Sequence, residues 1–193
     1  MRVVAGAAGG VPLVVPKGVD LRPTMELVKS AIFSSLGERI IGARVLDLFA
    51  GTGSLGIEAL SRGAASVVFV ESDARAVDAI KANLAKTRLT GETHLLDIFS
   101  YLDRLAKPGE FDLILADPPY AKRLGERDFS AELLASEGLA TALHAEGIFI
   151  LEHLPGAKLP VGESWNLSRQ KRYGATEVAF LFRATPASAP SGA

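Results

Sequence analysis

The residues best suited to chemistry form one short run, Asp117-Pro118-Pro119-Tyr120, which follows the apolar segment 111–116. Two consecutive prolines fix the backbone and remove two N–H donors, so the carbonyl groups there remain available as acceptors. The Asp117 carboxylate and the Pro118 carbonyl could hold both protons of an exocyclic base amine and aim its lone pair at a methyl group. The Tyr120 ring offers a face on which an extracted base could stack, a contact worth roughly 1 to 3 kcal/mol. This run predicts methylation of a base amine.

A second candidate site is the glycine-rich run 47–56, which lies between a predicted strand and a predicted helix. It contains the pattern G-x-G-x-x-G, and Glu71 ends the next strand about 20 residues on, as in nucleotide-binding units. Such glycines also arise where a strand only packs tightly on a helix, which is the less favoured alternative here. A dinucleotide would place its pyrophosphate on the helix N-terminus, where the Asp47 carboxylate would repel it. S-adenosylmethionine has no phosphate and carries an ammonium and a sulfonium, so Asp47 favours this ligand.

Each predicted cofactor contact has a physical reason. The glycine backbone allows close approach of the methionine end, and Asp47 could orient its amino group directly or through water. Glu71 could accept hydrogen bonds from both ribose hydroxyls. Asp97 could bind the adenine amine, although it could equally cap a helix beginning near Ser100. The predicted cofactor-binding residues are Asp47, Phe49, Gly51, Thr52, Gly53, Glu71, Ser72, Asp97, Ile98 and Asp117.

The elements that must position these residues alternate along the chain, as expected for a parallel sheet covered by helices. Predicted strands are 45–49, 66–71, 93–96, 111–116, 148–154 and 178–183, and predicted helices are 25–36, 55–61, 74–88 and 129–143. Asp73 is expected to cap the third helix. Trp165 is expected to pack against a terminal strand rather than to bind a base.

The ends of the chain depart from this alternation. Segments 2–5 and 13–15 flank Gly9-Gly10 and predict a small hairpin, and Thr24 is expected to cap the helix that follows. The last ten residues are uncharged and rich in alanine, serine and proline, which predicts a disordered tail. We therefore expect an N-terminal extension over residues 1–40, a main domain over 41–183 and a tail over 184–193.

Composition sets limits on the class of protein. The chain has 193 residues, enough for one domain with a core that needs no disulfide, and it has no cysteine. The longest uncharged stretch near the N-terminus contains three glycines and two prolines, which fits neither a membrane span nor a signal peptide. The three histidines lack metal-ligand spacing, and no Ser-His-Asp arrangement is supported. We expect a cytoplasmic protein without a bound metal.

Charge is distributed unevenly along the chain. Residues 1–44 carry a net charge of +3, residues 45–154 carry −7 and residues 155–193 carry +3. An acidic middle between basic ends suits a small-molecule site with a rim that contacts a polyanion, although chance could also produce it. The predicted phosphate contacts are Arg2, Arg22, Lys29, Lys122, Arg123, Arg169, Lys171 and Arg172.

These motifs permit a comparison with a known family. Asp117–Tyr120 is similar to the D/N-P-P-Y/F motif of S-adenosylmethionine-dependent enzymes that methylate base amines in nucleic acids. Together with the segments 21–24, 46–56 and 58–64, it makes the chain resemble the RsmD family of bacterial enzymes that methylate the exocyclic N2 of a guanine in 16S rRNA. The resemblance extends from Arg2 to about Arg183.

The resemblance implies a fold, a substrate and a cofactor. The fold would be an α/β, Rossmann-like methyltransferase fold with a seven-stranded, mostly parallel sheet, one antiparallel strand and a small N-terminal hairpin-plus-helix extension. The substrate would be 16S rRNA or the assembling small ribosomal subunit, and a monomer is the default expectation. The residues alone leave open an adenine or cytosine amino-methyltransferase acting on DNA or another RNA, a nicotinamide-dependent oxidoreductase, and a non-catalytic RNA-binding module.

Overall fold

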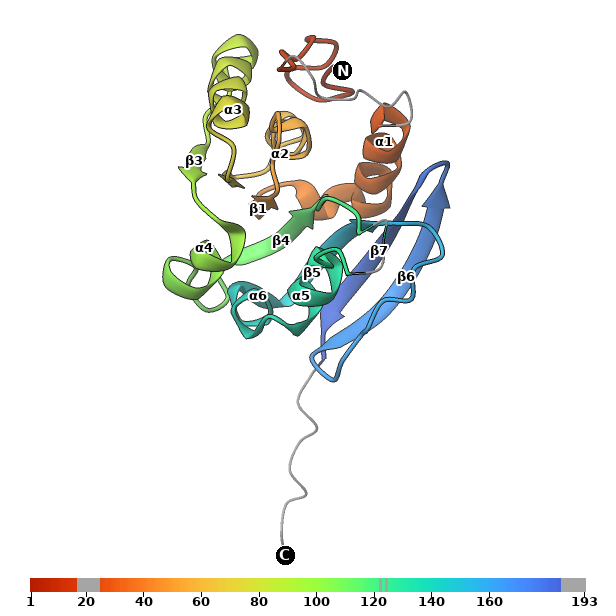
Figure 1. Cartoon of the computed structure of the whole chain (residues 1–193). Coiled ribbons are helices and arrows are strands. Elements are labelled where there is room, and N and C mark those ends of the chain that lie inside the picture. The colour runs from red at the N-terminus through yellow and green to blue at the C-terminus, as the bar shows by residue number, and fades with distance from the viewer. Residues whose placement is uncertain (17–24, 122, 124, 185–193) are drawn as a thin grey trace, which may run out of the picture.

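The computed structural model describes residues 1–16, 25–121, 123 and 125–184, and these residues contain a seven-stranded sheet (Figure 1). The strand order is β3-β2-β1-β4-β5-β7-β6. β7 runs antiparallel to both of its neighbours, and the other strands run parallel to one another. This confirms the predicted mixed sheet. The strands are β1 (Arg44–Leu48), β2 (Ser66–Glu71), β3 (Glu92–Leu95), β4 (Phe111–Ala116), β5 (Leu143–His153), β6 (Trp165–Tyr173) and β7 (Thr176–Arg183).

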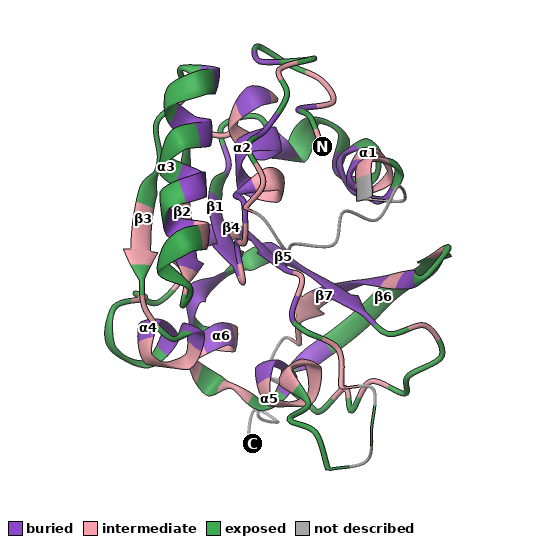
Figure 2. Cartoon of the chain, turned by 45° about the horizontal axis from the view of Figure 1, so that its top comes forward, coloured by how far each residue is buried: buried purple, intermediate pink, exposed green. Residues whose placement is uncertain are grey.

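Strand β6 has no counterpart among the strands predicted from sequence. It pairs only with β7 at the sheet edge, and all seven residues 166–172 are exposed (Figure 2). Because neither face of this stretch is buried, its sequence lacks the apolar alternation that marks a half-buried strand. Its first residue, Trp165, is buried, packs 5.3 Å from the Phe149 ring and donates its indole N–H to the Leu134 carbonyl. The expected packing role of Trp165 is confirmed.

Helices cover both faces of the sheet (Figure 1). One face carries α1 (Met25–Leu36), a 3-10 turn η1 (Gly37–Ile40), α2 (Ser54–Ser61) and α3 (Ala74–Thr87), and the other carries α4 (Ile98–Arg104), α5 (Phe129–Ala135) and α6 (Glu137–Ala142). Asp73 caps α3 as predicted. The single helix expected over 129–143 is wrong because Ser136 is extended and its hydroxyl accepts from the Leu139 N–H, which ends α5 and begins α6.

The core is divided by the sheet into two layers (Figure 2). Alternate residues of the central strands point to opposite faces. Val45 and Leu113 pack under α1–α3, whereas Leu46 and Ile114 pack against α4–α6. Burial on both sides explains why the central strands read as continuous apolar runs, and it holds their carboxyl ends at one fixed edge.

The N-terminal segment 1–16 packs on α2 and α3 rather than forming two regular strands. Its hairpin is reduced to one antiparallel bridge between Arg2 and Pro12, where the Val3 N–H donates to the Val11 carbonyl and the Leu13 N–H donates to the Met1 carbonyl. The predicted hairpin strands are therefore corrected to a compact loop. Val3 and Leu13 are buried in the same cluster as α1 and α2, so the segment is part of the main core. The proposed cap Thr24 lies outside the described residues.

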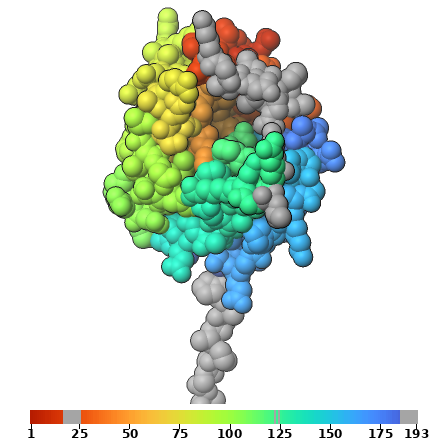
Figure 3. Space-filling model, in the orientation of Figure 1, coloured from red at the N-terminus to blue at the C-terminus, as the bar shows by residue number. Residues whose placement is uncertain are grey.

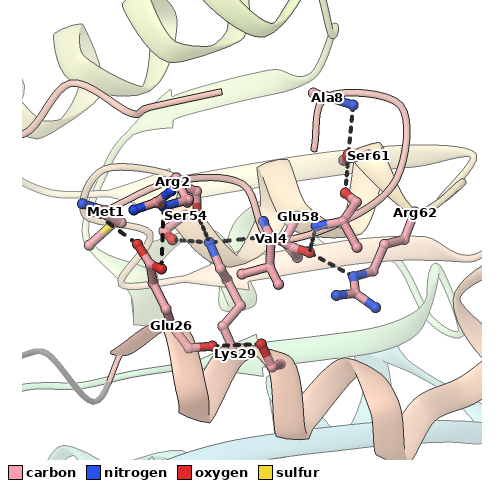
Figure 4. Close-up of polar contacts among 12 residues, drawn as sticks. Met1, Arg2, Val4, Ala8, Glu26, Lys29, Ser54, Glu58, Ser61 and Arg62 are labelled. Carbon is pink, nitrogen blue, oxygen red and sulfur yellow. Dashed lines mark hydrogen bonds and ion pairs between the residues drawn. The ribbon is translucent and has the colours of Figure 1, made fainter. Parts of the chain in front are cut away.

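A buried carboxylate attaches this segment to the domain (Figure 4). Glu58 in α2 is 0% exposed and accepts hydrogen bonds from the Val4 and Ala5 N–H groups at 2.7 and 3.0 Å. The Arg62 guanidinium lies 2.7 Å from it and the Lys29 ammonium 3.3 Å. A buried carboxylate with four donors is fully compensated, and removing it would leave charges and backbone donors unpaired.

We predict that Glu58→Ala destabilises the protein by about 3 to 5 kcal/mol, because the Lys29 charge and two backbone N–H groups lose their acceptor. Urea unfolding followed by circular dichroism measures this change. Glu38→Ala, which removes an exposed glutamate from η1, serves as the control and should change stability by less than about 0.5 kcal/mol. Equal effects of the two substitutions would contradict the assigned role of Glu58.

Candidate functional site

A cavity of about 310 Å³ opens at the carboxyl ends of the parallel strands β1 to β4. In Figure 3 the orange surface of the β1–α2 region lies between the yellow of α3 and the green segment that follows β4. Parallel α/β sheets bind ligands at this edge. The structure brings seven predicted residues together in the cavity wall, namely Phe49, Glu71, Ser72, Asp97, Ile98, Asp117 and Pro119, and it adds Arg127 and Phe129.

The glycine loop turns sharply between β1 and α2. Phe49, Gly51 and Gly53 have φ angles of 56°, 54° and 75°, in the left-handed region that favours glycine. Phe49 is a bulky residue in this region, an unusual conformation that must be held by its surroundings. A Cβ on Gly56 would lie 2.3 Å from the Phe69 ring, so this glycine is needed for α2 to pack closely on β2. Gly51 and Gly53 therefore form the turn, and Gly56 allows the close packing of helix on strand.

Asp47 lies under this loop and not in the cavity wall. Its side chain is buried, and one carboxylate oxygen accepts from the Gly56 N–H at 2.8 Å. Burial, with a smaller contribution from the charges of Asp117 and Glu71, raises the pKa of Asp47 to about 8 against the opposing effect of the Gly56 hydrogen bond. Because the Asp47 carboxyl faces the loop backbone and does not line the cavity, the indirect form of the prediction remains, in which Asp47 orients a ligand amine through water.

Glu71 is held in place by the backbone around it. Its carboxylate accepts from the N–H groups of Gly51 at 2.9 Å, Ser72 at 2.7 Å and Asp73 at 2.9 Å. The Ser72 hydroxyl also lies 3.4 Å from Oε1, whereas Oε2 accepts, among the described residues, only the Gly51 bond and can accept a further hydrogen bond from a ligand. The orientation of the carboxylate is fixed before any ligand binds, which reduces the entropic cost of binding.

Asp97 begins α4 at the end of β3. Its side chain accepts from the Ser100 N–H at 3.0 Å, so the helix-cap interpretation is confirmed. The same residue lines the cavity together with Ile98, whose side chain is buried. A contact of Asp97 with adenine is compatible with the cap because one carboxylate can accept several hydrogen bonds.

Arg127 and Phe129 belong to the cavity wall and were not predicted. The Arg127 guanidinium lies 4.5 Å from the Phe129 ring centroid and 5.2 Å from that of Phe99. It also makes paired hydrogen bonds to Glu132 at 2.8 and 2.7 Å. Phe129 in turn meets Phe49 edge-to-face at 5.2 Å. No sequence pattern predicts this aromatic cluster around Arg127, because Phe49 follows β1, Phe99 lies in α4 and Phe129 begins α5.

The remaining predicted site residues flank the cavity. Gly51 and Gly53 contribute the loop backbone, and Thr52 is buried with its carbonyl accepting from Asn83 at 3.0 Å. Pro118 is buried, and Pro119 is exposed at the cavity mouth. Tyr120 is half-buried, and its hydroxyl is hydrogen-bonded to Thr176 at the start of β7. The loop 117–120 is therefore held at its start by β4 and at its end by the hydrogen bond between Tyr120 and Thr176.

Among the predicted phosphate contacts, Lys29 needs correction. It is 2% exposed and its ammonium bonds the Arg2 carbonyl, Ser54 and Glu58, so it cannot reach a phosphate (Figure 4). Sequence position alone could not show this, because the partner Glu58 lies 29 positions further along the chain. Arg22 and Lys122 lie outside the described residues. Among the predicted phosphate contacts, those that are exposed are Arg2, Arg123, Arg169, Lys171 and Arg172.

Among the described residues, no group of three or more His, Asp or Glu side chains is placed to hold a metal ion. In the same part of the chain, no helix has the length and apolar character required to cross a membrane.

Comparison with known proteins identifies the family. A family profile described as "Conserved hypothetical protein 95" matches residues 1–182, nearly the whole chain. The chain belongs to this family, the RsmD family. The Bacillus subtilis protein YlbH is 38% identical over 184 residues, covering 93% of this chain and 97% of its own. The Escherichia coli protein named ribosomal RNA small subunit methyltransferase D is 33% identical over 177 residues, covering 90% and 85%.

Solved structures agree with this assignment to the RsmD family. The Escherichia coli protein yhhF superposes with a TM-score of 0.79 at 32% identity, covering 95% of this chain and 98% of that one. The Thermus protein TTHA0928 superposes with a TM-score of 0.77 at 29% identity, covering 95% and 99%. The architecture is that of Rossmann-like, S-adenosylmethionine-dependent methyltransferases, as the sequence resemblance implied.

The raised pKa of Asp47 gives a prediction about stability. Between the ordinary value of 3.8 and the folded-state value of about 8, the native state binds more protons than the unfolded chain, so this group makes stability fall as pH rises through that window. Asp47→Asn keeps an acceptor for the Gly56 N–H but carries no charge. Relative to wild type, the variant should therefore gain roughly 2 to 4 kcal/mol between pH 5 and pH 9.

Urea unfolding of both proteins at several pH values between 5 and 9 measures this difference. Asp103→Asn changes an aspartate that is exposed on α4 and provides the control, for which no such trend is expected. A constant stability difference between Asp47→Asn and wild type across the range would show that Asp47 is not protonated in the folded protein.

Proposed function

We propose that this RsmD-family protein methylates the exocyclic N2 amine of a guanine in 16S rRNA, using S-adenosylmethionine. The observation that carries the proposal is the position of Asp117: its side chain lines the cavity at the end of β4, beside two prolines and Tyr120. The relatives from Escherichia coli and Haemophilus influenzae, at 33% and 34% identity, are named ribosomal RNA small subunit methyltransferase D. Their names support an rRNA substrate, and the modified atom is part of our proposal.

The cavity has the chemistry that this cofactor requires. Glu71, Asp97 and Asp117, at the ends of β2, β3 and β4, line the cavity and create a negative potential that suits an ammonium and a sulfonium and repels phosphate. Phe49, Ile98 and Phe129 provide apolar surface for an adenine ring, and Glu71 is oriented for ribose hydroxyls. Bound there, the cofactor supplies an electrophilic methyl group carried by a sulfonium.

The loop 117–120 binds and orients the exocyclic amine of the base. An exocyclic amine is a poor nucleophile because its lone pair is delocalised into the ring. The Asp117 carboxylate and the Pro118 carbonyl accept hydrogen bonds from the two N–H groups of the amine. These bonds favour a pyramidal nitrogen and orient its lone pair toward the methyl group. The rigid proline backbone avoids reorganisation during the reaction. Tyr120 supplies a stacking face for a base removed from its helix.

Exposed basic residues would hold the RNA around this site. Arg2 lies on the N-terminal segment, while Arg169, Lys171 and Arg172 lie on the exposed strand β6, which contains no acidic residue. Contacts of this kind set affinity and salt dependence rather than sequence choice. Arg22 and Lys122 remain proposed contacts from the sequence alone. The partner would be 16S rRNA or the assembling small subunit in the cytoplasm, bound by a monomer.

We predict that Asp117→Ala reduces methyl transfer by at least about 100-fold, because the amine loses the acceptor that orients it. The affinity for S-adenosylhomocysteine, measured by calorimetry, should stay within about threefold of wild type. Asp103→Ala removes an exposed carboxylate from α4 and controls for general charge effects. Loss of both cofactor binding and transfer, or of neither, would contradict the role given to Asp117.

The substrate is tested by transfer of a labelled methyl group onto 30S particles, naked 16S rRNA and duplex DNA, followed by mass spectrometry of the nucleosides. N2-methylguanosine in rRNA supports the proposal. Methyladenosine or methylcytosine would identify a different amino-methyltransferase activity. Tight binding of NADH without binding of S-adenosylhomocysteine would indicate an oxidoreductase, and binding of RNA without transfer to any substrate would indicate a binding module.

A further inference from the structure

Two separate hollows lie on either side of the loop 117–120. The larger cavity is lined by Asp117 and Pro119 but not by Tyr120. A recess of about 40 Å³ on the other side is lined by Tyr120 and Ala121, by Asp128 and Ser130 at the start of α5, and by the segment 153–160. Tyr120 therefore lines the recess and does not line the proposed cofactor cavity.

The hydroxyl of Tyr120 is connected to the sheet. It is hydrogen-bonded to the Thr176 hydroxyl on β7, and Thr176 is 3% exposed. Thr176 in turn lies 3.4 Å from the Glu152 carboxylate and 3.5 Å from the His153 carbonyl on β5, both of which accept only. Either hydroxyl can donate in the bond between Tyr120 and Thr176, and in both cases the bond ties the end of the Tyr120 ring to β7.

The supporting strands are themselves fixed around this contact. β5 and β7 pair antiparallel, with Glu152 opposite Val178 and His153 opposite Glu177. The His153 ring is buried, which lowers its pKa, and it bonds the Leu154 carbonyl on one side and Gln170 of β6 on the other. Thr176 is therefore held in a rigid part of three adjacent strands, whereas Tyr120 belongs to a loop.

We infer that Thr176 is a positioning residue for the methyl-accepting base: by holding the Tyr120 hydroxyl, it sets the plane of the ring against which the base stacks beside Asp117. The inference rests on the proposed function, in that the substrate is a nucleic-acid base. Without the Thr176 hydroxyl the ring could rotate about its side-chain bonds, and a stacked base would be less well aligned with the carboxylate.

The first test is a double-mutant cycle on methyl transfer to 30S particles that lack the modification. Thr176→Val removes the hydroxyl at nearly constant volume, and Tyr120→Phe removes its partner and keeps the ring. Each should lower kcat/KM for RNA by roughly 3- to 10-fold, the effect of one neutral hydrogen bond, and the double variant should be no worse than either single variant. Thr176→Ser, which keeps the hydroxyl, should restore the wild-type value within about twofold.

Affinity for S-adenosylhomocysteine separates positioning from simple loss of structure. It should be unchanged in all four variants, because Tyr120 and Thr176 do not line the larger cavity. Additive losses in the double variant, or a parallel loss of cofactor affinity, would overturn the inference.

A second readout does not depend on activity. The chain has three tyrosines, so ring signals of a protein labelled with ¹³C-tyrosine can be assigned by substitution. Thr176→Val should shift and broaden the Tyr120 ring signal, and Thr176→Ser should not. An unchanged Tyr120 signal in Thr176→Val would overturn the inference even if methyl transfer were confirmed. Absence of methyl transfer by wild type, with the ring signal behaving as expected, would instead count against the proposed function.

Discussion

The site depends on the convergence of carboxylates at one edge of a parallel sheet. Asp47, Glu71 and Asp117 lie at the carboxyl ends of three neighbouring strands, and two buried core layers hold these ends together. Their mutual repulsion, together with burial, raises the pKa of Asp47 to about 8. The clustered carboxylates repel one another in the free protein. A bound cation offsets this repulsion, so we expect a positively charged ligand to stabilise the arrangement.

The rest of the fold supports this edge. The glycine loop can turn above Asp47 only because Gly56 lets α2 approach β2, and its N–H then donates to Asp47. The N-terminal segment is attached to the same helix through Glu58, and Asn83 on α3 links Val14 to the carbonyl of Thr52 in the loop. Residues 1–16 are therefore anchored beside the glycine loop.

Sequence reasoning succeeded where chemistry is local and failed where it is not. The loop 117–120 and the cap at Asp97 could be predicted because each depends on residues adjacent in the chain. Burial of Lys29 could not, because its partner Glu58 comes from another helix. Strand β6 lacks apolar alternation because its middle is exposed on both faces. The position of Arg127 could not be predicted because it depends on contacts with the Phe99 and Phe129 rings, which come together only in the folded protein.

The most direct test of carboxylate convergence is the number of protons exchanged when S-adenosylmethionine binds. Asp47 is mostly protonated at pH 7 in the free protein and should ionise beside a bound cation, so binding should release up to about one proton. Calorimetry at pH 7 in phosphate and in Tris measures this release from the difference in binding heat. The account predicts a release in wild type that is absent in Asp47→Asn. Identical proton exchange in the two proteins would contradict it.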